Sequence, residues 1–202
     1  MSLFFQRKFL PLFVLFQAGT INDNMLKNAL IALVTYGGMI LFSDSMPRDG
    51  LVATAALLFT LPFLILCTIA GQIADKVDRS TVLKWVKRAE VLIMIIAALG
   101  FYLESTYILA FSLFLMGAQS AFFSPTKNAV LPQWLEEKDL IKANGVLSGF
   151  QFFSILLGMI IGIKIVLMGP TLGSLSGPRM VACILLMLGL VGWYAAEKLP
   201  EA

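Results

Sequence analysis

The first apolar stretch of the chain carries side chains that lipid does not favour. They lie between Phe9 and Gly37, in a segment otherwise long and apolar enough to cross a membrane. A charged side chain at membrane depth is costly and persists mainly where it faces a protein interior or a water-filled cavity. At about 100° per residue along a helix, the polar side chains of this stretch fall within an arc of roughly 140°, and only Asn22 lies outside that arc. The pattern predicts a helix with one polar face, made by Gln17, Thr20, Asp23, Asn24, Lys27 and Asn28.

Asp23 and Lys27 stand four residues apart, so they can pair on the surface of one helix. Two interpretations remain open. In the first, Asp23 binds a proton or a cation and Lys27 attracts a phosphate group. In the second, the pair only holds the helices together. Asn24 and Asn28 can likewise bind a polar headgroup, or link helices through hydrogen bonds worth about 0.6 kcal/mol each.

A second polar face follows in the apolar stretch Tyr107–Val130. Lys127 comes shortly after Pro125, and a proline at this point kinks or ends a helix. Lys127 either binds a phosphate near the inner mouth of a cavity or anchors the helix end at the membrane surface. The residues that share an arc of about 140° on this helix are Ser112, Gln119, Ser120, Ser124 and Lys127.

Two spacings favour structural roles. Glu90 comes three residues after Lys87, which favours a local ion pair over a coupling acid. Gly158 and Gly162 form a small-xxx-small pattern, which favours close packing of two helices over ligand binding.

The composition identifies the class of protein that these helices must build. The 202 residues are 59% hydrophobic and 13% charged, and the mean hydropathy is +0.89. Soluble domains carry about 25% charged residues, so the chain is expected to be an all-α integral membrane protein. There are no histidines, which excludes histidine triads, histidine acid–base chemistry and histidine metal ligands. No enzyme, metal site or nucleic-acid partner is expected.

Six stretches are long enough to span a bilayer, which takes about 20 apolar residues. They form a single domain over residues 1–202, and no soluble domain fits between them. Because the first and fourth stretches have similar polar faces, the six are expected to form two groups of three, as in transporters built from inverted repeats. The predicted spans are Phe9–Gly37, Leu51–Ala74, Leu83–Leu103, Tyr107–Val130, Ile141–Met168 and Met180–Ala196.

Basic residues predict the orientation of these spans, because cytoplasmic loops carry an excess of lysine and arginine. Only Arg48 and Arg179 fall at one side of the predicted bundle. Both chain ends are therefore expected in the cytoplasm. The basic residues assigned to the cytoplasmic side are Arg7, Lys8, Lys76, Arg79, Lys84, Lys87, Arg88, Lys127, Lys138, Lys142 and Lys198.

The segment from Gly71 to Arg79 resembles the signature of the major facilitator superfamily, G-x-L-A-D-[RK]-x-G-R-[RK]. Asp78 stands in place of the usual glycine and Ser80 in place of the second basic residue. The resemblance implies a gate in which Asp75 contacts a helix of the other half and holds the cytoplasmic side closed. The alternative is an ordinary cytoplasmic loop. The matching residues are Gly71, Ala74, Asp75, Lys76 and Arg79.

Three further segments resemble the bacterial lysophospholipid transporters of that superfamily. They are Asn22–Asn28 in the first span, Phe123–Asn128 at the end of the fourth, and Lys142–Gly145 at the start of the fifth. Members of that family have twelve spans. The resemblance therefore implies an N-terminal six-helix bundle with a 3+3 inverted repeat, needing a second six-helix half. That half would be a missing C-terminal half, a separate chain or a homodimer mate.

The resemblance also implies a function: movement of lysophospholipids across the bacterial inner membrane by alternating access, with proton or sodium coupling and no other cofactor. Two alternatives stay open, a small-molecule or drug exporter of the same superfamily and a membrane scaffold that transports nothing. The residues expected to meet substrate or coupling ion are Gln17, Asp23, Asn24, Lys27, Asn28, Gln119, Ser124 and Lys127.

Overall fold

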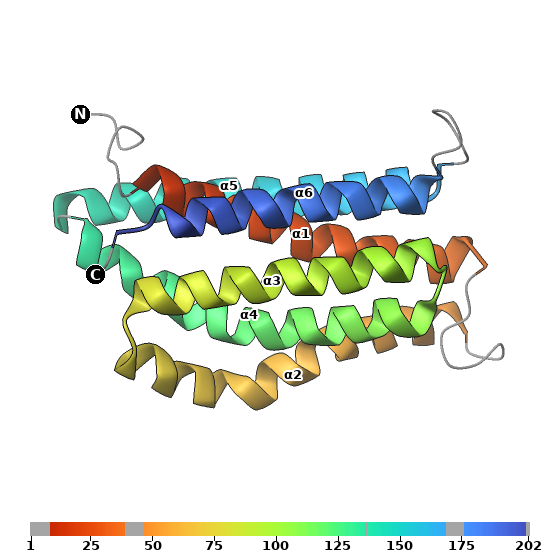
Figure 1. Ribbon diagram of the computed structural model, residues 1–202, viewed down its shortest axis with the longest axis horizontal. Helices are drawn as coiled ribbons and strands as arrows, with labels where there is room; N and C mark the ends of the chain where they lie inside the picture. Colours follow the sequence, from red (N-terminus) through yellow and green to blue (C-terminus); the bar gives the residue numbers. More distant parts are fainter. Residues whose placement is uncertain (1–8, 39–46, 136, 169–175, 201–202) are drawn as a thin grey trace.

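The computed structural model describes residues 9–38, 47–135, 137–168 and 176–200, and these residues form six helices. Figure 1 shows them running nearly parallel or antiparallel along one long axis. Each predicted span falls on one helix. The helices are α1 (Phe9–Tyr36), α2 (Arg48–Lys76), α3 (Arg79–Tyr102), α4 (Thr106–Trp134), α5 (Glu137–Val166) and α6 (Gly177–Glu197).

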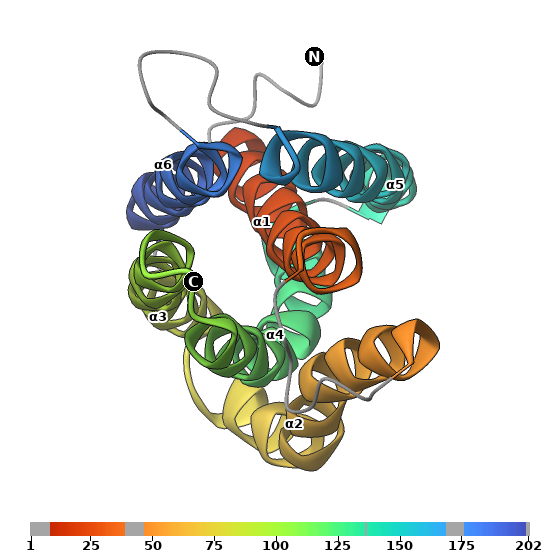
Figure 2. The ribbon, with the colours of Figure 1, turned by 90° about the vertical axis from the view of Figure 1, so that its right-hand side faces the viewer.

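Helix α1 occupies the middle of the bundle, with α5 and α6 on one side and α4 on the other (Figure 2). It packs chiefly on α5 and α6, while α4 packs chiefly on α2 and α3. The packing of α3 on α6 joins the two sets. Helix α2 is left at the outer edge, where it contacts mainly α4.

The glycines of α5 allow its close approach to α1, as the small-xxx-small pattern predicts. A Cβ atom on Gly158 would lie 2.6 Å from the carbonyl oxygen of Ile21, and one on Gly162 would lie 2.7 Å from that of Met25. Both separations are too short for a real side chain. The backbones of α1 and α5 therefore meet at these two glycines.

The turn between α2 and α3 explains one departure from the signature. The Asp78 carboxylate accepts hydrogen bonds from the backbone N–H of Thr81 (2.9 Å) and from its hydroxyl (3.0 Å). An N-cap side chain of this kind satisfies an amide at the start of a helix, which glycine cannot do. Helix α3 therefore begins directly after Asp78.

Two apolar cores lie at different levels of the bundle. One fills the half that contains the end of α1 and the start of α6, around Leu30 and Leu185. The other fills the half that contains the start of α1 and the end of α6, around Leu12 and Ala196. Between these cores, at mid-height, lie the polar residues of α1, α3 and α4.

Four of the helices, α2, α4, α5 and α6, are long and apolar enough to cross a membrane, judged over the described residues. Helices α1 and α3 carry more polar side chains, and several of these are buried against one another, as described below. Membrane crossing by α1 and α3 therefore stays a prediction, because hydropathy alone does not support it.

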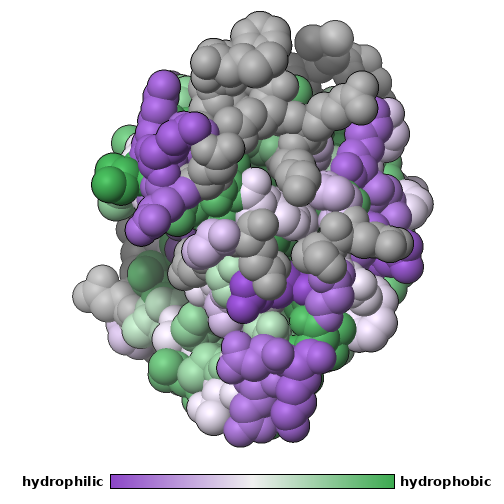
Figure 3. All heavy atoms as spheres, turned by 90° about the vertical axis from the view of Figure 1, so that its left-hand side faces the viewer, coloured by the Kyte–Doolittle hydropathy of each residue, from purple (hydrophilic) through white to green (hydrophobic). Residues whose placement is uncertain are grey.

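One end of the bundle carries the start of α1, the α2–α3 turn, the α4–α5 turn and the end of α6 (Figure 1, left). Hydrophilic residues crowd this end in Figure 3. Arg7 and Lys8 lie outside the described residues. The exposed charged residues at this end include Asp75, Lys76, Asp78, Glu137, Lys138 and Lys198.

Candidate functional site

A half-buried polar face runs along α1 and meets α4. The hydroxyl of Ser120 on α4 donates to Asp23 Oδ2 over 3.3 Å. Lys27 donates to Asn24 Oδ1 over 3.4 Å. The ion pair that the spacing of Asp23 and Lys27 allows does not form: each side chain has a different hydrogen-bond partner, and the described salt bridges join other residues.

The two asparagines of this face bond to their own helix. Asn24 Nδ2 donates to the carbonyl oxygen of Thr20 over 2.9 Å, and Asn28 Nδ2 donates to that of Asn24 over 2.7 Å. The hydrogen bonds that the structure shows for these side chains therefore stay within α1 rather than linking helices. Their geometry holds the amide nitrogens against the backbone.

Lys127 points into the bundle. Its ammonium donates to Gln151 Oε1 of α5 over 3.3 Å and lies 5.6 Å from the centre of the Phe16 ring of α1. Helix α4 continues through Pro125 to Trp134, so the proline does not end it. The assignment of Lys127 to a cytoplasmic link between helices is thus wrong. The residue lies within α4, and its side chain is half-buried between α1, α4 and α5.

Behind this face lies a fully buried cluster centred on Glu90 of α3. Lys87 Nζ and Glu90 Oε2 form an ion pair of 2.6 Å, and their side chains are 0% and 1% exposed. Asn22 of α1 donates to Glu90 Oε1 over 3.1 Å, and Gln119 of α4 donates to Glu90 Oε2 over 3.4 Å. The expected local ion pair is confirmed. The assignment of Lys87 to a cytoplasmic link is wrong, because α3 carries it into the protein interior.

The absence of a side chain at Gly19 makes room for the Lys87 ammonium. A Cβ atom on Gly19 of α1 would collide with Lys87 Nζ, and one on Gly192 of α6 would lie 3.6 Å from it. The ammonium also lies 4.9 Å from the centre of the Phe123 ring. Gly19 therefore provides the niche that lets a lysine enter the core, and Gly192 and the Phe123 ring border it.

Some predicted site residues serve contacts between helices. Gln17 is buried, and its Oε1 accepts a hydrogen bond of 2.8 Å from Ser154 of α5. Ser124 is half-buried on α4. Asn22 falls outside the polar arc of α1 and was not expected to take part, yet it is fully buried against Glu90. Within the described residues, Gln17 Nε2 and Asn22 Oδ1 are buried without a hydrogen-bond partner.

The charges at this level do not balance. Asp23 lies within electrostatic reach of Lys27, Lys87, Glu90 and Lys127. Three lysines therefore face two carboxylates, and with all of them ionised one positive charge is in excess. A site of this kind favours an anionic group.

The signature residues lie at the end of the bundle, apart from the polar face. Asp75 and Lys76 are exposed. Arg79 Nη1 donates to the carbonyl oxygen of Ala129 over 2.6 Å, which fixes the start of α3 against α4. A Cβ atom on Gly71 would meet nothing within 4 Å, so no described helix of this chain needs the close approach that this glycine allows.

Comparison with known proteins supports the conclusion that this chain belongs to a family of membrane transporters. Residues 38–197 match the major facilitator family model described as transmembrane secretion effector. The chain belongs to this family. The matched region begins after α1 and contains the signature, Lys87, Glu90 and the polar residues of α4.

A curated relative belongs to the family that the sequence motifs resemble, the lysophospholipid transporters. The chain is 28% identical over 106 residues to the lysophospholipid transporter LplT of Photorhabdus laumondii. The alignment covers 52% of this chain and 25% of the relative. The chain thus matches about a quarter of that protein's length.

Proposed function

We propose that this chain is a six-span bundle that forms one half of a transporter for lysophospholipids in the bacterial inner membrane. The observation that carries the proposal is the half-buried polar face of α1 and α4, at mid-height and with an excess of positive charge. Transporters bind their substrates near the bilayer midplane, between two bundles that rock against each other. The match to a lysophospholipid transporter supports the choice of substrate.

The packing of the helices supports a 3+3 inverted repeat. Helix α1 packs on α5 and α6 as α4 packs on α2 and α3. Exchanging the first three helices with the last three therefore preserves the main packing pairs, although α5 also contacts α6 and α2 has no comparable contact with α3. The pairing of Asn22 with Glu90 supports membrane crossing by α1 and α3, because it turns their polar groups toward each other rather than toward lipid.

In this proposal Lys27 and Lys127 bind the phosphate, and Asn24, Asn28 and Ser124 bind the polar headgroup. Asp23 binds the coupling ion, a proton or sodium.

Gln17 and Gln119 hold the helices that carry the site. A second six-helix half covers the polar face, and Asp75 contacts it when the cytoplasmic side closes. Both chain ends lie in the cytoplasm.

Binding to the purified chain in detergent tests the phosphate site. The probes are fluorescent lysophosphatidylethanolamine and a fluorescent monoacylglycerol of the same chain length, which lacks the phosphate. Because a hydrogen bond to a charged group contributes about 1.5–3 kcal/mol, Lys27→Gln and Lys127→Gln should each weaken lysolipid binding about tenfold or more. Lys164→Gln is the matched control, since Lys164 is exposed on α5. Equal binding of both probes, or equal loss in the control, would exclude a phosphate site.

The family description favours one second candidate, an exporter of small molecules. A cationic dye separates the two functions, because excess positive charge should exclude it from the polar face. Competition of ethidium with lysophosphatidylethanolamine would favour the exporter. Binding of lysolipid unaffected by ethidium would favour lipid transport.

A further inference from the structure

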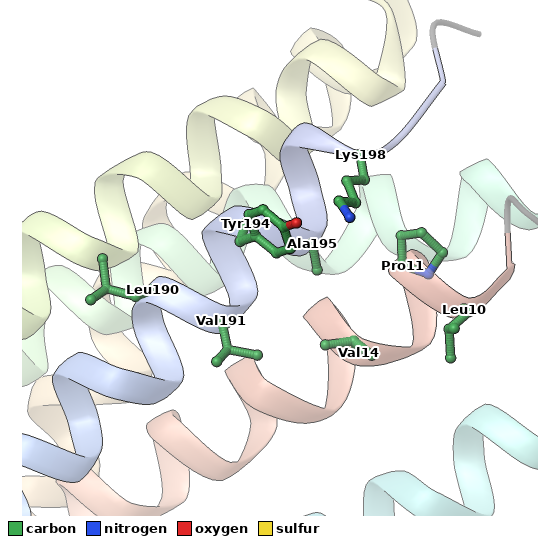
Figure 4. A pocket seen from close by; sticks show the side chains of 8 residues that line it. All are labelled: Leu10, Pro11, Val14, Leu190, Val191, Tyr194, Ala195 and Lys198. Carbon is green, nitrogen blue, oxygen red and sulfur yellow. The ribbon is translucent and has the colours of Figure 1, made fainter.

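Two apolar grooves lie on α6, one toward each end of the helix. The first, which we call the Lys198 groove, lies between α1 and α6 and has a volume of about 420 Å³. Figure 4 shows its apolar side chains in two rows, with Lys198 at the end where α6 stops. The side chains that form it include Leu10, Val14, Leu190, Val191, Tyr194 and Lys198.

The second, which we call the Arg179 groove, lies between α3 and α6 at the opposite end. Its volume is about 440 Å³, and it is lined by apolar residues that include Leu99 and Leu186. Arg179 stands at its end beside Tyr102. The two grooves therefore share one design, an apolar floor with a cation and a tyrosine at the outer end.

The cation and the tyrosine are in contact in both grooves. Lys198 Nζ lies 4.5 Å from the centre of the Tyr194 ring, and the Arg179 guanidinium carbon lies 5.2 Å from that of Tyr102. All four side chains are exposed. The ring holds each cation at the mouth of its groove and leaves the rest of the charged group open to another molecule.

The positions of the two cations fit the two surfaces of a bilayer. The separation of Arg179 and Lys198 along the chain corresponds to a rise of about 28 Å in a helix. The hydrocarbon core of a bilayer is about 30 Å thick. Each cation would thus stand at the level of lipid headgroups, where tyrosines also gather, and each groove would extend from there into the acyl layer.

We propose that each groove binds one phospholipid with a net negative headgroup, one in each leaflet. An acyl chain lies along the apolar floor, and the phosphate meets Lys198 or Arg179. Charge complementarity argues for this occupant, because basic sites beside membrane helices bind anionic headgroups. The proposal requires that α6 crosses the membrane together with the parts of α1 and α3 that line the grooves, but it does not depend on what the polar face transports.

Native mass spectrometry of the detergent-purified chain tests the proposal by counting bound lipids. The probes are phosphatidylglycerol, which is anionic, and phosphatidylethanolamine with the same acyl chains. We expect two phosphatidylglycerol molecules to be retained in preference to phosphatidylethanolamine. Because one cation near a headgroup contributes about fivefold in affinity, Lys198→Gln and Arg179→Gln should each lower retention at one site by about that factor. The double variant should lose both preferences.

Three further variants distinguish a built site from a loss of fold or a general lipid belt. Lys198→Arg should retain both lipids, and Lys164→Gln, at an exposed lysine on α5, should behave as wild type. Val191→Trp, which fills the Lys198 groove but keeps its cation, should lose one lipid at unchanged melting temperature. Equal retention of both probes by every variant would overturn the proposal and leave only adventitious detergent-resistant lipid.

Discussion

Glu90 receives hydrogen bonds from three helices at once. Lys87 of its own helix, Asn22 of α1 and Gln119 of α4 all donate to its two oxygens. A buried ion pair contributes little net stability, but removing one partner leaves the other charge buried and uncompensated. These hydrogen bonds can all form only when α1, α3 and α4 have the correct positions along the bundle axis. The cluster therefore favours one alignment of the three helices.

Replacing Lys87 alone should be severely destabilising. Lys87→Met leaves the Glu90 carboxylate without its cation, which costs about 3–5 kcal/mol. The double variant Lys87→Met, Glu90→Gln removes both charges and should recover most of that loss. Chemical unfolding in detergent measures both, with Lys164→Met as the exposed control. A double variant no more stable than the single one would contradict this account of the cluster.

Asp23 should behave differently, because the hydrogen bond that the structure shows for its carboxylate comes from a neutral group, the hydroxyl of Ser120. Asp23→Asn keeps a hydrogen-bond acceptor, so the free energy of unfolding should change by only about 1 kcal/mol. In the proposed transporter, the same change should abolish ion-driven uptake of lysolipid. Uptake and melting temperature, both measured on Asp23→Asn, decide whether Asp23 couples transport to an ion or stabilises the fold. A large loss of stability would make Asp23 a structural residue, and normal uptake would exclude coupling.

Single-helix periodicity explains which of these residues could be found from the sequence. It placed Asp23, Asn24, Lys27 and Asn28 on one face of α1, where the structure has them half-buried. It missed Asn22, because the buried cluster is built from three helices and no single helix shows it. The sequence alone could not show why position 19 is a glycine, because the space that Gly19 leaves is filled by Lys87 of another helix.

At the scale of the element, α5 offers two glycines in very different surroundings. Gly158 meets the α1 backbone, whereas a Cβ atom on Gly149 would meet nothing within 4 Å. Both lie in the interior of the same helix. The pair therefore separates the effect of helix packing from that of backbone freedom.

Alanine should have opposite effects at these two positions. At Gly149 it should raise stability, because alanine favours a helix over glycine by about 1 kcal/mol. At Gly158 it should lower the melting temperature, because its Cβ atom would lie 2.6 Å from a backbone oxygen of α1. Thermal melts of Gly149→Ala and Gly158→Ala in one detergent measure the two effects. A rise in melting temperature at both positions would mean that α1 and α5 are not in close contact.

Helix positions were largely predictable and helix ends less so. Apolar length placed one helix on each predicted span, but α4 continues to Trp134, four residues past the predicted end at Val130. It passes through Pro125 and Pro132 on the way. A proline removes one backbone hydrogen bond, and neighbouring helices can compensate for that loss in a way the sequence does not reveal.

At the scale of the whole molecule, the distribution of exposed charge predicts how the bundle sits in the membrane. Lys76 and Arg179 are both exposed. Lys76 ends α2 and Arg179 lies in the first turn of α6, and these two helix ends are at opposite ends of the bundle (Figure 1). In a background with both cysteines replaced, an impermeant thiol reagent added to intact cells should label Arg179→Cys and leave Lys76→Cys unlabelled. Opening the cells should expose the second position. Labelling of Lys76→Cys in intact cells would overturn the proposed orientation.

Counting basic residues placed two lysines in loops that the structure places inside helices. Lys87 and Lys127 counted toward the cytoplasmic total, yet one is buried and the other half-buried. A sequence gives a lysine the same charge wherever it lies. Only the niche formed by neighbouring helices decides whether that charge anchors a loop or enters the interior.

The central place of α1 has a consequence for the order in which the protein is made. Its main neighbours, α5 and α6, are the last of these six helices to leave the ribosome, so α1 cannot reach its final packing until all six have been made. Contacts between distant parts of a chain form slowly. Before α5 and α6 are made, α2 and α3 already have their main partner, because α4 packs chiefly on both of them. We therefore expect α2, α3 and α4 to pack together first, and α1 to be enclosed only once α5 and α6 have been made, although α1 precedes all five in the chain.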